Sequence, residues 1–199
     1  NRNTAFNPFT IEGKKTAALE IAGDLTPDEA DVVVVPAGDG VVVSGIAKGF
    51  SDLHRAGLLH RPPRLLVVQP EGSSAIARAL REHSSEIVPL SHAASVADSL
   101  VVNAPRNAIM ALAEVRGSGG TGVTVSDDEI LDGIVHLARV TGVFAEPAAA
   151  ADDHYARGGQ TDQRRFEAEG GDVALPQLPR TAAADPLGDL PGAAKIMRF

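Results

Sequence analysis

The chain has 199 residues, of which 44% are hydrophobic and 22% charged, so its composition is that of an ordinary globular protein. Eighteen Lys and Arg residues against 26 Asp and Glu residues give a net charge of −8, which argues against a nucleic-acid partner. The absence of cysteine excludes disulfide bonds, thiolate metal sites and a cysteine nucleophile. Because no apolar run approaches the roughly 20 residues that span a bilayer and no signal peptide is visible, we expect no membrane partner and a cytoplasmic location.

Short β-branched runs alternate with helical segments along most of the chain. In chain order we expect a helix over 14–22, a strand over 32–35, a helix over 44–59, and strands over 65–68 and 123–125. The strand runs lack polar alternation, which is typical of strands that are buried on both faces. The alternation therefore predicts an α/β fold, with a mostly parallel sheet and helices on both of its faces.

Three helix starts can be read from polar residues. Ser126 and Glu129 have the spacing of a capping box, and an apolar stripe follows them. Ser73 and Ser74 are placed to cap a second helix, and a third should begin near Asn107.

The pattern ends after Pro147. Residues 151–199 are rich in Ala, Gly, Pro, Asp and Arg and show no sustained period of 2 or 3.6. We therefore expect one α/β domain over residues 1–150 and an irregular tail over 151–199, which an out-of-frame reading of the gene near Ala151 would explain.

A glycine-containing turn follows the first predicted strand. Gly38, Asp39 and Gly40 lie where a buried strand ends and a helix begins, which is where open α/β sheets bind ligands. Glycines allow successive backbone N–H groups to converge on an anion beside a helix N-terminus, so a phosphate is the expected guest. A Gly-Asp-Gly sequence after a strand is also common in turns without a ligand. The P-loop and dinucleotide-binding patterns are both absent.

Four sequence blocks occur in an order and spacing that resemble threonine synthases, which are fold type II pyridoxal-phosphate (PLP) enzymes. The blocks are NPFTIEGKKTAA at 7–18, VVPAGDG at 34–40, VQPEG at 68–72 and GVFAEPA at 142–148. The resemblance implies that these residues form most of the large PLP-binding domain of such an enzyme, without its N-terminal part. It also implies a PLP-dependent lyase that, when intact, converts O-phosphohomoserine to threonine and phosphate.

The resemblance assigns the cofactor phosphate to the glycine turn, with Gly38, Asp39, Gly40 and Val41 as its ligands. The family usually has another glycine where this chain has Val41, although a valine N–H group can still donate there.

Substrate contacts are implied for Thr4, Asn7 and Glu146. Threonine synthases commonly carry a basic residue at the position of Thr10. A hydroxyl group there can reach a phosphate oxygen, but it lacks a cation's charge, so a PLP-dependent dehydratase or β-replacement enzyme also fits.

The family's Schiff-base lysine lies in a Ser-x-x-Lys-Asp-Arg type of motif, which does not occur in these 199 residues. We therefore assign no catalytic residue, and expect the chain alone to be inactive or to be a non-catalytic, phosphate-binding fragment. The intact enzyme would take a small amino-acid substrate, and a homodimer is typical of the family. The six histidines are scattered without a carboxylate partner at ligand spacing, so we expect no metal site.

Overall fold

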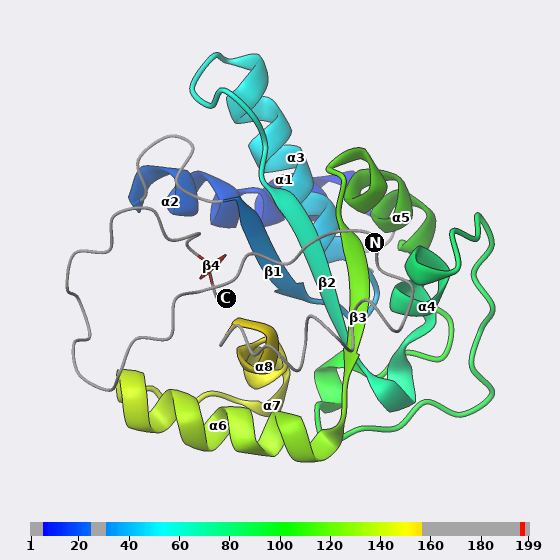
Figure 1. The fold of residues 1–199 in the computed structure, drawn as a ribbon. Helices are drawn as coiled ribbons and strands as arrows, with labels where there is room; N and C mark the ends of the chain where they lie inside the picture. The colour runs from blue at the N-terminus through cyan, green and yellow to red at the C-terminus, as the bar shows by residue number, and fades with distance from the viewer. Residues whose placement is uncertain (1–5, 25–30, 157–195, 198–199) are drawn as a thin grey trace.

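The computed structural model of the chain describes residues 6–24, 31–156 and 196–197. Its parallel sheet has the strand order β3-β2-β1-β4 (Figure 1). The strands are β1 (Val32–Pro36), β2 (Arg64–Pro70), β3 (Thr121–Val125) and the short β4 (Ile196–Met197). This arrangement confirms the predicted α/β class with a parallel sheet.

Helices cover both faces of the sheet (Figure 1). One face carries α2 (Thr16–Asp24), α3 (Val41–Arg55), α4 (Ala75–Arg81) and α5 (Ala108–Gly117), with α1 (Pro8–Lys14) packed on α3. The opposite face carries α6 (Asp127–Thr141), α7 (Pro147–Ala150) and α8 (Asp153–Ala156). Two short 3₁₀ turns, Glu71–Ser73 (η1) and Asp98–Leu100 (η2), lie in the connections.

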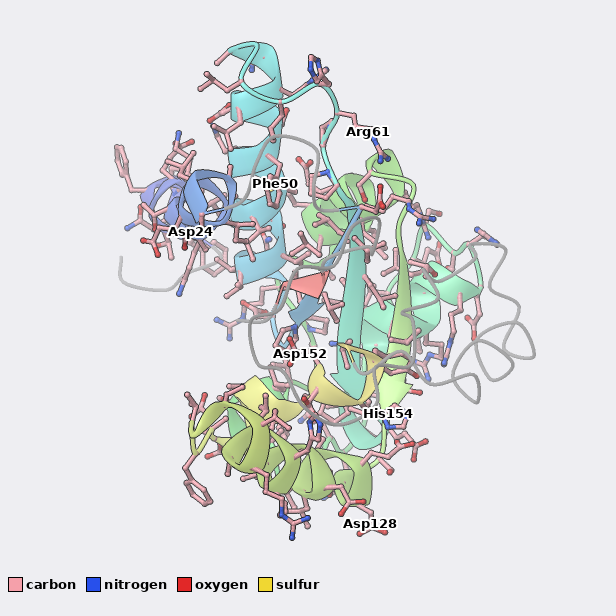
Figure 2. The ribbon with its side chains drawn as sticks, turned by 60° about the vertical axis from the view of Figure 1, so that its left-hand side comes forward. Asp24, Phe50, Arg61, Asp128, Asp152 and His154 are labelled. Atoms are coloured by element: carbon pink, nitrogen blue, oxygen red, sulfur yellow. The ribbon has the colours of Figure 1, made fainter. Side chains whose placement is uncertain are left out.

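Successive residues of the central strands enter two different cores. Val33 and Val35 of β1 pack with Phe50 and the other apolar residues of the α3 side, whereas Val32 and Val34 pack with the α6 side. Since both sets are buried, β1 has no solvent-exposed face, as its unbroken apolar sequence predicted. Figure 2 shows Phe50 on α3, and Asp152 and His154 on the opposite side of the sheet near α6.

The expected helix over 14–22 is wrong in its bounds. A helix already begins at Pro8, where the side chain of Asn7 accepts a hydrogen bond from the Phe9 N–H group at 3.1 Å. The first helix ends at Lys14, and α2 then continues from Thr16. Proline in the first turn and an asparagine cap are ordinary helix-starting signals, which the apolar spacing alone did not reveal.

The helix expected over 44–59 is also wrong in its bounds, since α3 runs from Val41 to Arg55, whereas the expected capping box at Ser126 is present. Helix α3 begins at Val41, three residues before the expected Ser44, because Gly40 and not a serine occupies its N-cap. The capping box of α6 is confirmed: the Ser126 hydroxyl accepts from the Glu129 N–H group at 3.3 Å, and Glu129 accepts from the Ser126 N–H group at 2.8 Å.

Packed structure continues beyond residue 150. Tyr155 of α8 is buried, and its hydroxyl donates to the carbonyl oxygen of Thr124 on β3 at 2.9 Å. Residues 157–195 and 198–199 of the expected irregular tail lie outside the described residues. In the described part of the chain, no helix is both long enough and apolar enough to cross a membrane.

Candidate phosphate site at the N-terminus of helix α3

A cavity of about 490 Å³ opens at the carboxyl end of β1, beside the first turn of α3. Its lining includes all four residues that we expected to hold a phosphate, Gly38, Asp39, Gly40 and Val41, together with Glu146. Glu146 immediately precedes α7 and lies more than 100 positions along the chain from the glycine turn. The fold therefore brings five of the seven expected site residues to one cavity.

The other two expected residues are placed differently. Asn7 caps α1 and does not appear among the residues that line the cavity. Thr4 lies outside the described residues. Lys14 lines the cavity from the last turn of α1.

The glycine turn requires glycine at two positions. Gly40 has φ +89°, a left-handed conformation that L-residues with side chains rarely adopt. A Cβ atom there would also stand 3.0 Å from the Cβ of Ala111 on α5. At Gly38, a Cβ atom would stand 3.1 Å from the carbonyl oxygen of Ser99. These contacts let the backbone itself form one wall of the cavity.

The start of α3 presents backbone donors to this cavity. Within the described residues, no side chain caps the helix, and no protein acceptor receives the N–H groups of residues 38–41. Helix α3 has 15 residues, so its dipole places partial positive charge at the same end. The first turn of α3 and the preceding loop can therefore hold an anion.

The side chain of Gln69 on β2 is hydrogen-bonded to the first half of this loop. It is 1% exposed, and its Nε2 atom donates to the carbonyl oxygens of Ala37 at 2.8 Å and Gly38 at 3.4 Å. Its Oε1 atom accepts from the N–H groups of Ile76 and Ala77, at 2.9 and 2.8 Å. Gln69 thereby caps α4, a role that we had expected of the serines at 73 and 74.

Asn107, the N-cap residue of α5, is hydrogen-bonded to the second half of the loop, at Asp39 and Gly40. Its buried Nδ2 atom donates to the carbonyl oxygen of Gly40 at 3.1 Å and to Ser44 Oγ at 2.8 Å. Its backbone N–H group donates to the carbonyl oxygen of Asp39 at 3.2 Å. The Asp39 carboxylate accepts from the Arg106 N–H group at 2.5 Å. It therefore does not occupy the N–H groups of residues 38–41.

The sequence interpretation missed Gln69 and Asn107 as parts of the site. One signal was available for Gln69, because it directly follows the predicted strand 65–68, and an amide that an extension of such a strand buries must find hydrogen-bond partners. Nothing comparable marks Asn107, whose partners lie 63 and 67 positions away in the sequence.

Neighbouring lysines differ in their surroundings. Lys15 and Lys48 form four ion pairs with Glu12 and Asp52, at 2.8–3.1 Å. Two of these pairs, Lys15–Asp52 and Lys48–Glu12, link the end of α1 to α3. Hydrogen bonds from these lysines lower the pKa of both carboxyl groups, and the same contacts raise the pKa of both lysines. Lys14 takes no part in this network, so its charge is available to the cavity.

Two histidines have carboxylate partners, contrary to the expectation from the sequence: His154 Nε2 lies 3.5 Å from Glu129 Oε1, and the second pair is closer. His136 of α6 has a carboxylate partner, since its Nδ1 atom lies 3.0 Å from Oδ2 of the buried Asp153. The two residues lie 17 positions apart, in α6 and α8, which made the pair invisible to local spacing. The described residues contain no group of three or more His, Cys, Asp and Glu side chains suited to a metal ion.

Comparison with known proteins agrees with this geometry. Residues 1–173 match the sequence profile of a family described as "Pyridoxal-phosphate dependent enzyme". The threonine synthase of Methanocaldococcus jannaschii is 35% identical over 147 residues, which are 74% of this chain and 36% of that protein. The threonine synthase of Mycobacterium tuberculosis is 36% identical over 145 residues, covering 73% and 38%. The chain thus spans little more than a third of the length of these curated relatives.

Solved structures show the same fold at lower identity. Maize serine racemase aligns with a TM-score of 0.59 and 23% identity over 73% of this chain and 42% of that one. The processed form of threonine deaminase isoform 2 from Solanum lycopersicum aligns with a TM-score of 0.62 and 22% identity, covering 75% and 38%. At this level of identity the two alignments establish a shared fold.

Proposed function

The chain belongs to the family of pyridoxal-phosphate-dependent enzymes, and we propose that it is the part of a threonine-synthase-like lyase that binds the phosphate of the cofactor. The observation that carries the proposal is the cavity at the start of α3, where the N–H groups of residues 38–41 have no protein acceptor within the described structure. A phosphate dianion satisfies several such donors at once and is favoured by the helix dipole.

The residues of the cavity fit this group. Gly38, Asp39, Gly40 and Val41 would hold the phosphate through backbone N–H groups, and the two glycines keep the wall free of side chains. Pyridoxal phosphate, when bound, supplies an electron sink that stabilises negative charge on substrate carbons. The role of the loop is to anchor and orient the ring, because a fixed phosphate leaves the cofactor few ways to turn.

The proposed reaction of the intact enzyme is the conversion of O-phosphohomoserine to threonine and phosphate. It is supported by the names of the curated relatives at 32–37% identity. We propose that Thr4, Asn7 and Glu146 contact the amino-acid substrate, of which Glu146 lines the cavity. The sequence lacks the family's lysine motif, so we propose that these residues bind ligands but do not complete the reaction alone.

A dehydratase or β-replacement activity is the second candidate, and Thr10 is the observation that favours it. Thr10 occupies the position where threonine synthases commonly carry a cation, and a neutral hydroxyl group holds a substrate phosphate less strongly than a cation. An enzyme acting on an unphosphorylated amino acid would need no cation there.

A chimeric enzyme tests the proposal and separates these candidates. The matched segment of this chain would replace the corresponding segment of the Methanocaldococcus jannaschii threonine synthase, whose remaining sequence supplies the rest of the enzyme. We expect the chimera to form threonine and phosphate from O-phosphohomoserine. Release of a 2-oxo acid from serine or threonine, without threonine formation, would favour the second candidate. A folded chimera that binds no pyridoxal phosphate would contradict both.

A further inference from the structure

We propose that Gln69 and Asn107 are positioning residues that make the loop over residues 38–41 selective for a phosphoryl group. This inference rests on the proposed function, because it concerns how the same loop would recognise its ligand. Neither side chain needs to touch the ligand. Each acts on carbonyl oxygens of the loop, and so determines which way the neighbouring peptide groups face.

Four consecutive carbonyl oxygens of the loop are engaged by these two residues. Gln69 Nε2 takes the first two, at positions 37 and 38, at 2.8 and 3.4 Å. Asn107 takes the next two, through its backbone N–H group at position 39 and its Nδ2 atom at position 40, at 3.2 and 3.1 Å. Ser44 Oγ also donates to the carbonyl oxygen of Gly40, at 2.9 Å.

Peptide geometry turns these contacts into a direction for the donors. In a trans peptide the C=O and N–H groups point in opposite directions, and the described residues contain no cis peptide bond. Each engaged carbonyl at positions 37–40 therefore directs the N–H group of the following residue away from its partner. Those four N–H groups belong to residues 38–41, which line the cavity and donate to no protein acceptor in the described structure.

The chemistry of the two amides explains why carboxylates could not replace them. An amide nitrogen donates to a carbonyl oxygen, whereas a carboxylate only accepts and would repel it. Gln69→Glu keeps the size of the side chain and its acceptor for the N–H groups of Ile76 and Ala77, but it loses both donors to the loop. The freed carbonyl oxygens could then turn toward the cavity and oppose an anion.

The test compares two ligands that differ only in the phosphoryl group. Pyridoxine 5′-phosphate and pyridoxine carry no aldehyde, so neither can react with lysine amines. The ratio of their dissociation constants would be measured by calorimetry for the full chain and for Gln69→Glu, Asn107→Asp and Thr124→Val. Thr124 is a suitable control, because it is buried and paired with Gln69 across β2 and β3, and its hydroxyl accepts from Arg81 at 3.5 Å, with no hydrogen bond to the loop in the described structure.

We expect the unaltered chain to bind the phosphorylated ligand more tightly. In the two amide variants the ratio of the two dissociation constants should fall about tenfold, as for one lost charge-assisted hydrogen bond. Thr124→Val should keep the preference even if it lowers stability. A general loss of stability would weaken the binding of both ligands alike and leave the ratio of their dissociation constants unchanged. An unchanged ratio in both amide variants would overturn the inference and leave the proposed function intact. Equal affinity of the unaltered chain for the two ligands would overturn both.

A second measurement does not depend on the variants being folded. Backbone amide resonances of the ¹⁵N-labelled chain would be followed while inorganic phosphate is added. We expect the signals of residues 38–41 to shift together, and those of the exposed turn around Gly57 to stay. Shifts that avoid residues 38–41 would overturn both the inference and the proposed function.

Discussion

Lys14 on α1 packs directly against Gly45 on α3, where a Cβ atom on the glycine would overlap the Cβ atom of Lys14. One turn later, a Cβ atom on Gly49 would stand 2.6 Å from the Cβ of Ala18 on α2. The two glycines let α1 and α2 lie close against α3. This contact brings Lys14 to the cavity at the start of α3.

Replacement of Gly45 by alanine should therefore destabilise the chain by about 1–3 kcal/mol, the usual cost of an overpacked contact. Urea denaturation followed by circular dichroism measures the change. Gly13→Ala is the control, because Gly13 lies in α1 and a Cβ atom added there would have no neighbour within 4 Å. That substitution should be neutral or stabilising, since alanine favours a helix by about 1 kcal/mol. Equal losses in the two variants would contradict the close contact.

The four ion pairs of Lys15 and Lys48 with Glu12 and Asp52, two of which link α1 to α3, should make stability depend on pH. The pKa values of Glu12 and Asp52 are lowered by their lysine partners, so their contribution is present above about pH 4 and is lost as the pH falls through the lowered pKa values. The pKa values of Lys15 and Lys48 are raised, so their contribution persists below about pH 10.5 and is lost above it.

Asp52→Asn should flatten the acid side of this profile. The melting temperature would be measured between pH 3 and pH 7 for the unaltered chain, for Asp52→Asn and for the exposed control Glu20→Gln. We expect the difference between the unaltered chain and Asp52→Asn to shrink toward low pH and in high salt, because the pairs are partly solvent-exposed. A difference in melting temperature that depends on neither pH nor salt would show that packing, and not charge, joins the helices.

Gly40→Ala should lower both the stability of the fold and the affinity for phosphate. The left-handed conformation costs a non-glycine residue about 1–2 kcal/mol, and the contact with Ala111 adds to that cost. Gly57→Ala separates the two causes, because Gly57 has φ +73° but a Cβ atom added there would meet nothing within 4 Å. We expect Gly40→Ala to unfold at lower urea than Gly57→Ala and to bind phosphate more weakly. If both variants bind phosphate like the unaltered chain, the loop is not the binding site.

Lys14→Gln should weaken phosphate binding by about two- to fivefold, the range for an exposed ion pair. The control is Arg55→Gln, which removes the same charge at the opposite end of α3. Binding would be measured at low and high sodium chloride concentrations, since salt should erase the difference. Equal effects of the two substitutions would mean that only the net charge of the chain matters.

The sequence predicted the central strands, the capping box of α6 and the glycine turn between β1 and the next helix, because each depends on residues close together in the chain. It did not predict the start of α3, because a glycine in the left-handed conformation, and not a serine, stands at the N-cap of this helix. Gln69 and Asn107 also escaped notice, because their partners come from other elements. Glu146 was identified only through the family resemblance; the structure then placed it at the cavity.

Recognition of a phosphate by residues 38–41 is the property on which the proposed function depends most directly. Calorimetric titration of pyridoxine 5′-phosphate into the full chain, with and without inorganic phosphate as a competitor, measures this property. We predict saturable binding at one site, competition by phosphate, and an affinity at least about tenfold higher than that of pyridoxine, from the charge-assisted hydrogen bonds. Equal affinities for the two ligands, or binding that phosphate does not displace, would contradict the account.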